Sequence, residues 1–195
     1  MRRFLLRSLV VAAGLALTAC ANNNPPTPTL PPLTFADKPP FVLNVARIEI
    51  VSQFSAPTAA PHIEYELPVS PENAIRRWVQ DRIQPRGTTG VLRVVIRNAS
   101  ATETSAPEAS GGMFNNEPQD KVDMAVDVDL QLLDERQFVV ADVTGQAMRG
   151  ETLFTDLKLN ERDKFLYEMV RQLVGTLGDQ LSQRIPINFH SQMMY

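Results

Sequence analysis

Few side chains in this chain of 195 residues have the chemistry for nucleophilic catalysis. The two histidines, His62 and His190, fall in a proline-rich loop and near the C-terminal end, and neither accompanies a Gly-x-Ser-x-Gly turn. A serine or cysteine nucleophile needs a base within hydrogen-bond reach, and that base is usually histidine. The sequence therefore predicts a protein that is not an enzyme, with no bound cofactor and no metal site.

Three carboxylates, Asp123, Asp127 and Asp129, share one face of a predicted strand and raise the alternative of a calcium site. Calcium sites usually wrap a loop around the ion, whereas alternate residues of a strand lie about 7 Å apart. We therefore expect cross-strand ion pairs instead. Antiparallel pairing with the preceding strand would bring Arg93 near Asp129 and Arg97 near Asp127 or Asp123.

The one cysteine, Cys20, follows a segment typical of protein export. Residues 1–7 carry three arginines and no acid, and Ser8 to Leu17 form an apolar run that is too short to span a bilayer. The run ends at Leu17, Thr18, Ala19 and Cys20, which resembles the lipobox of bacterial lipoproteins. We therefore predict a signal peptide over residues 1–19, with a mature chain that begins at a lipid-carrying Cys20.

The lipobox resemblance implies a location as well as a modification. Acyl chains on Cys20 would anchor the protein to a membrane, since each buried CH₂ contributes about 0.8 kcal/mol. Ala21 follows the cysteine, and by the sorting rule of Gram-negative lipoproteins this implies the periplasmic face of the outer membrane. Loss of Arg2, Arg3 and Arg7 would leave 16 basic against 22 acidic residues, a formal charge of −6, which disfavours nucleic acid as a partner.

The mature chain divides into a tether, one domain and a tail. Residues 20–40 hold the lipidated cysteine and a proline-rich stretch with too little apolar surface to fold, which predicts an extended tether. Residues 41–186 are long enough for one globular domain, and residues 187–195 follow as a C-terminal tail. A single cysteine allows no internal disulfide, so the core alone must stabilise the domain.

Apolar periodicity gives the order of the elements in this domain. Alternation predicts strands over Phe41–Phe54, from Gly90, over Lys121–Leu132 and over Phe138–Met148, with a long polar connection at residues 103–120. Ser70-Pro71-Glu72 opens a helix that stops at Pro85, and Asn160 caps a longer helix that ends at Pro186. The order predicts an α+β two-layer sandwich, with both helices on one face of a mostly antiparallel four-stranded sheet.

This layout has a family resemblance. The lipobox, the tether, the strand, helix, three-strand, helix order and the segment Leu159-Asn160-Glu161-Arg162-Asp163 resemble an uncharacterised family of Gram-negative envelope lipoproteins. The layout is more distantly similar to auxiliary lipoproteins of ABC-type and MCE-type intermembrane transport systems, and to the lipoprotein plug of the lipopolysaccharide export pore. The resemblance rests on topology and length, and only the lipobox is a specific motif.

The anchor, the tether and the lack of catalytic groups together favour a non-enzymatic accessory subunit. We expect a lipid-anchored periplasmic domain that docks on an envelope protein in outer-membrane assembly or intermembrane lipid transport. Two alternatives stay open. A periplasmic enzyme acting on envelope polymers would need a deep polar cleft, and a passive structural or lipid-carrying lipoprotein would need an apolar cavity between helices and sheet.

Overall fold

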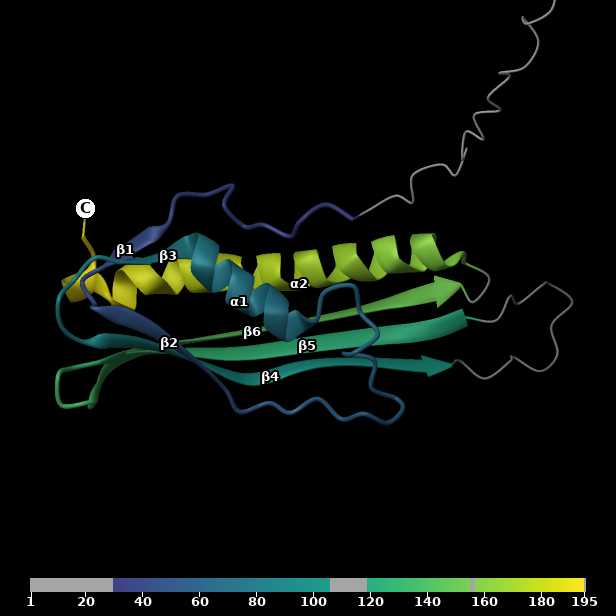
Figure 1. Cartoon of the computed structure of the whole chain (residues 1–195), viewed down its shortest axis with the longest axis horizontal. Coiled ribbons are helices and arrows are strands. Elements are labelled where there is room, and N and C mark those ends of the chain that lie inside the picture. Colours follow the sequence, from purple (N-terminus) through teal and green to yellow (C-terminus); the bar gives the residue numbers. More distant parts are fainter. Residues whose placement is uncertain (1–29, 106–118, 155–156, 195) are drawn as a thin grey trace, which may run out of the picture.

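The computed structural model describes residues 30–105, 119–154 and 157–194. The predicted signal peptide and lipobox lie outside this part of the chain. Two helices and a four-stranded sheet dominate the fold (Figure 1). The elements are β1 (Phe41–Leu43), β2 (Arg47–Ser52), α1 (Pro71–Arg82), β3 (Ile83–Pro85), β4 (Val91–Ser105), β5 (Gln119–Leu133), β6 (Val139–Phe154), α2 (Leu159–Asn188) and a 3₁₀ helix, η1 (His190–Gln192).

The main sheet has the order β2-β4-β5-β6. β2 runs parallel to β4, and β4, β5 and β6 are antiparallel neighbours. Successive side chains of a strand point to opposite faces, and in β5 the even-numbered apolar residues all point into the core. They are Val122, Met124, Val126, Val128, Leu130 and Leu132, each at most 2% exposed.

Both helices cover the same face of this sheet, so the predicted α+β two-layer sandwich is confirmed. Small residues set the spacing between the layers. A Cβ on Gly145 of β6 would lie 2.8 Å from a methyl group of Leu181 of α2. Trp78 of α1 is buried against Gly178 of α2, where a Cβ would lie 2.2 Å from the indole nitrogen. Glycine at these two positions therefore lets α2 approach both the sheet and α1.

The predicted first strand, Phe41–Phe54, is wrong as one continuous element. The chain forms β1 and β2, and β1 leaves the main sheet to pair in parallel with β3. Leu43 and Val45 are both buried, and Ala46 donates a backbone hydrogen bond to Thr89. The chain thus turns between two core residues, which strand alternation alone does not reveal.

The helix starts and stops were only partly predicted. Ser70 caps α1 as expected, accepting a hydrogen bond from the Asn73 amide, but α1 ends at Arg82 and continues directly into β3. The Asn160 cap is wrong, because α2 begins at Leu159 and the Lys158 carbonyl accepts from the Glu161 and Arg162 amides.

The predicted stop of α2 at Pro186 is also wrong. The helix continues to Asn188, and the Phe189 amide donates to the carbonyl of Ile185. Proline removes its own N–H, and its ring crowds the carbonyl four residues earlier, here that of Ser182. Because Ile185 and Phe189 are both fully buried, packing holds the last turn despite that missing hydrogen bond.

The packed chain extends beyond residues 41–186 at both ends. Phe35 is buried, and its amide donates to Asp81 of α1, so residues assigned to the tether already lie against the domain. After α2, the Met194 amide donates to the Val42 carbonyl beside β1. Apolar residues isolated among prolines or polar groups, such as Phe35 and Phe189, carry no periodicity and so gave no signal in the sequence.

β5 and β6 run beyond their predicted bounds, and β6 continues to Phe154. Of the predicted connection at residues 103–120, residues 103–105 and 119–120 belong to β4 and β5, and residues 106–118 lie outside the described part. None of the helices in the described ranges is apolar over a length that could cross a membrane.

Candidate functional site

The candidate site lies along β6, which is an edge strand because, among the described residues, it pairs only with β5. Residues of an edge strand direct their backbone groups alternately toward the neighbouring strand and toward the free edge. Two hydrogen bonds identify which residues face outward. The Thr144 carbonyl accepts from Arg184 and the Gln146 amide donates to Gln180, so even-numbered residues here face the free edge.

This free edge has two halves. The guarded half, Thr144–Gln146, is covered by the side chains of Gln180 and Arg184 from the C-terminal half of α2. The open half, Met148–Thr152, presents the outward backbone groups of Met148, Gly150 and Thr152, which receive no hydrogen bond from any described residue. Met148 itself is 84% exposed.

A groove of about 410 Å³ separates the open half of β6 from the N-terminal half of α2. Figure 1 shows α2 running along β6 over this length. Phe165 and Met169 of α2 provide apolar side chains in the groove. Charged and amide side chains from both elements complete its lining: Arg149, Glu151, Glu161, Lys164, Glu168 and Gln172.

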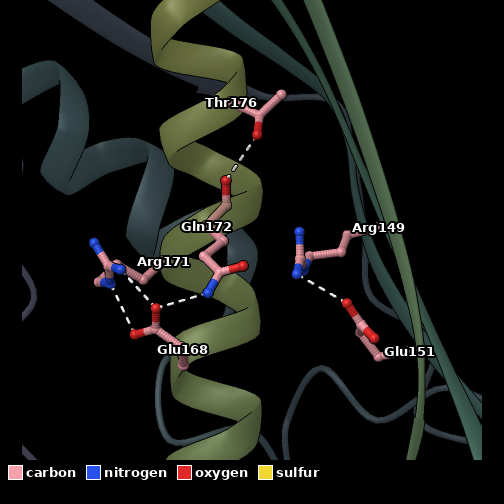
Figure 2. Close-up of polar contacts among 6 residues, drawn as sticks. All are labelled: Arg149, Glu151, Glu168, Arg171, Gln172 and Thr176. Atoms are coloured by element: carbon pink, nitrogen blue, oxygen red, sulfur yellow. Dashed lines mark hydrogen bonds and ion pairs between the residues drawn. The ribbon is translucent and has the colours of Figure 1, made fainter.

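Most of the charge in the groove is already paired. On the β6 wall, Arg149 donates to Glu151 at 2.8 Å. On the α2 wall, Arg171 donates from both Nε and Nη2 to the carboxylate of Glu168, and Gln172 donates to the same carboxylate at 2.8 Å. Figure 2 shows these two clusters on separate elements.

The α2 cluster fixes the ionisation of Glu168. Hydrogen bonds from Arg171, and then from Gln172, lower the pKa of Glu168 from 4.5 to about 2. The same carboxylate raises the pKa of Arg171 through its hydrogen bonds. A carboxylate that stays ionised at any physiological pH is a poor general acid or base, because efficient proton transfer needs a pKa near the working pH.

The predicted site residues lie elsewhere. Leu17, Thr18, Ala19 and Cys20 fall outside the described residues. The aspartates and arginines lie on the outer face of the sheet, away from the helices. Arg97 contacts Asp129 at 2.8 Å, while Arg93 lies 3.6 Å from Glu49 of β2.

The three aspartates do not converge on one point. Asp129 is nearly buried beneath the side chains that donate to it, Arg97, Gln131 and Thr144. Asp127 accepts from Gln146, and Asp123 pairs with Lys121. A bulge in β4 between Ile96 and Asn98 shifts the register, so Asp127 lies opposite Asn98 and Arg97 reaches Asp129 instead.

The histidines also lie apart from the groove. His62 contacts Glu64 at 3.0 Å, and Glu64 accepts in addition from the amide of Ala101, which lies in the part of β4 that β2 does not pair with. His190 begins η1 at the opposite end of α2 from the groove. In the described ranges, no group of three or more His, Cys, Asp or Glu side chains is placed to hold a metal ion.

The groove residues were not identified from the sequence. Phe165 and Met169 follow the helical spacing of the apolar face of α2, and Met169 is indeed a core residue that is 2% exposed. Such spacing shows that a face is apolar without showing where the sheet beneath it ends. Arg149 and Glu151 lie beyond the predicted end of their strand. A signal was available, because Leu153 continues the inward alternation past these two charged residues.

No protein-family model matches the chain, and no curated protein does. Among solved structures, a minor lipoprotein from Acinetobacter baumannii aligns with a TM-score of 0.37 and 8% identity, over 78% of this chain and 98% of that one. A dodecameric variant of PelC from Paraburkholderia phytofirmans aligns with a TM-score of 0.22 and 16% identity, over 71% and 91%. Likeness this weak carries no functional argument.

Proposed function

We propose that this protein is a lipid-anchored, non-enzymatic accessory subunit of the Gram-negative envelope. Acyl chains on Cys20 hold it to the periplasmic face of the outer membrane, and the domain docks a protein partner in outer-membrane assembly or intermembrane lipid transport. The membrane location rests on the export segment and the lipobox resemblance. The docking role rests on the groove between α2 and β6.

The observation that carries the docking role is the open half of β6 beside Phe165 and Met169. Backbone donors and acceptors there lie next to apolar side chains, the combination that protein interfaces bury. Arg149 and Glu151 on one wall, and Arg171 and Glu168 on the other, neutralise each other, and the pKa of Glu168 is too low for proton transfer near neutral pH. This arrangement supports recognition of a partner better than it supports catalysis.

Affinity purification of the full chain from detergent-solubilised envelopes tests the proposal. We expect a stoichiometric membrane partner with the wild type, and loss of that partner with Phe165→Glu, which places a charge on the groove floor. Thr176→Glu is the matched control, because Thr176 is an exposed residue of the same helix outside the groove. Both variants are first checked for unchanged thermal unfolding.

Three results would count against the proposal. Recovery of the free protein alone under mild detergents contradicts an accessory role. Turnover of an envelope polymer by the purified protein favours the enzyme alternative, and co-purified phospholipid without a protein favours a lipid carrier. The anchor is tested separately, because Cys20→Ala should yield an unprocessed precursor or a soluble domain; normal processing and membrane retention of that variant would refute lipidation.

A further inference from the structure

We infer that the partner binds by strand addition, as an extended segment that pairs with the open half of β6 and places apolar side chains under α2. This inference deepens the proposed docking function and rests on it. It specifies the conformation of the bound segment and the chemistry of its side chains.

Backbone geometry provides the first step. The outward groups of Met148, Gly150 and Thr152 form a row of donors and acceptors with the two-residue repeat of a β ladder. Natural edge strands are usually protected by proline, lysine, inward-pointing charges or a covering element. β6 contains neither proline nor lysine, and the α2 side chains that cover Thr144 and Gln146 make no hydrogen bond to Met148–Thr152. Its inward-pointing charges, Arg149 and Glu151, are paired with each other, which lowers the cost of placing a strand beside them.

The groove provides the second step. A strand paired with the open half would direct alternate side chains toward the face that carries Arg149 and Glu151, and thus toward Phe165 and Met169. A groove of about 410 Å³ has room for side chains of this kind. The bound segment therefore lies between an edge strand and a helix, which is a known mode of peptide recognition.

Charge decides which side chains fit. Arg149 and Glu151 neutralise each other at 2.8 Å, and Arg171 neutralises Glu168. A charged side chain that reached Arg149 or Glu168 would have to break one of these pairs, whereas an apolar side chain buries Phe165 without disturbing them. Glu161 and Lys164 lie exposed at the groove and can pair with charges elsewhere on the bound segment. The occupant is therefore an extended peptide with apolar residues at alternate positions and no requirement for net charge.

A second copy of the chain fits this edge less well. Two β6 strands paired about a two-fold axis would lie about 4.8 Å apart, and each carries an α2 that packs chiefly on β6. Helix pairs need 8–10 Å between their axes. The two α2 helices would collide, whereas a lone strand slides beneath one helix.

Selection of random octapeptides against the full chain in mild detergent tests the inference. We expect enrichment of peptides with apolar residues at positions i and i+2. Binding should slow amide exchange at Met148, Gly150 and Thr152 and leave Gln146 unchanged. Thr152→Pro should weaken binding about tenfold or more, since it removes an outward N–H and places a ring in the path of the added strand.

Thr144→Pro is the matched control, because Thr144 faces the same edge within the guarded half. It should leave binding unchanged. If Thr152→Pro fails to fold, Phe165→Glu compared with Thr176→Glu provides the same contrast. Three results would overturn the inference. The selected peptides could carry apolar residues at helical spacing, the two proline variants could lose peptide binding equally, or the wild type could select no more peptide than the Phe165→Glu variant. If the protein forms a dimer in which the amides of Met148–Thr152 exchange slowly without any peptide, the edge binds a second copy of the chain and the inference is wrong.

The outcomes separate this inference from the proposed function. If the envelope partner still co-purifies with a folded Thr152→Pro variant, strand addition is overturned while the accessory role stands. If no envelope partner is recovered with any variant, the accessory role fails, and the peptide selection still decides whether the edge accepts an extended segment.

Discussion

The two halves of the free edge of β6 show how one strand can be closed in one place and available in another. Along Thr144–Gln146, α2 lies close to the strand, because Gly145 leaves room for Leu177 and Leu181 and the side chains of Gln180 and Arg184 reach the backbone. Along Met148–Thr152, charged inward residues replace the small ones, and a groove separates the helix from the strand.

This difference suggests that protection of the edge depends on the distance between layers. Small inward residues let the helix lie close to the sheet, so that its polar side chains can hydrogen-bond to the backbone of β6. Arg149 and Glu151 hold the layers apart, so the same helix leaves the backbone of its neighbour unpaired. A side chain added at the inward Gly145 should therefore disturb the guarded half strongly, whereas one added at Gly150, on the outer face of the open half, should have little effect.

The largest expected effect comes from Gly145→Val. The added side chain would meet Leu177 and Leu181 at less than 3 Å from its first carbon, inside a fully buried contact. Overpacking of this kind typically costs about 1–3 kcal/mol. Urea denaturation should show a lower free energy of unfolding, and amide exchange should show the Gln146 N–H losing protection as α2 moves away.

Gly150→Val is the comparison in the open half. Its first carbon would meet Asp123 Oδ1 at 2.4 Å, but this atom is the end of a half-exposed side chain on the outer face and can move. We expect a change within about 0.5 kcal/mol. A loss as large as that of Gly145→Val would show that the outer face at Gly150 has no more room for a side chain than the contact between Gly145 and α2.

Gln180→Ala tests the guarding contact directly. The Gln146 amide loses its acceptor, so its exchange rate should rise toward those of Met148, Gly150 and Thr152, and stability should fall by about 0.5–1 kcal/mol. Gln183→Ala is a control on an exposed residue of the same helix turn. Unchanged exchange at Gln146 would mean that the contact does not guard the edge.

The sequence predicted the layers of the fold better than their ends. Alternation in β5 and helical spacing in α2 each report which face is apolar, and these repeated signals predicted the two-layer sandwich. Single contacts were missed because they have no repeat: the buried Phe35, the turn at Val45, and the continuation of α2 through Pro186 each depend on what the rest of the chain places nearby.

The groove was missed for a related reason. Arg149 and Glu151 interrupt the apolar alternation of β6, so the strand was predicted to end at Met148, although backbone pairing with β5 continues to Phe154. Burial patterns detect a strand only where its inward face is apolar. A strand segment whose inward residues are charged, such as Met148–Thr152, therefore leaves no apolar alternation in the sequence.

The smallest expected effect concerns the charged wall of the open half. Hydrogen bonds from Arg171 and Gln172 lower the pKa of Glu168 to about 2 in the folded protein, against 4.5 for the free side chain. A carboxyl group with a depressed folded pKa contributes stability that is present above pH 4.5 and is lost as the pH falls toward 2. Because the cluster is largely exposed, solvent screening limits this contribution to about 0.2–1 kcal/mol.

Glu168→Gln should therefore lower the free energy of unfolding slightly at pH 7, and the difference from the wild type should shrink below pH 4.5 and disappear near pH 2. Urea denaturation at pH 7, 4 and 2.5 measures this difference, with Glu135→Gln as a control on an exposed glutamate of the turn between β5 and β6. If the difference in unfolding free energy between Glu168→Gln and the wild type does not change with pH, Glu168 stabilises α2 through packing and not through its charge.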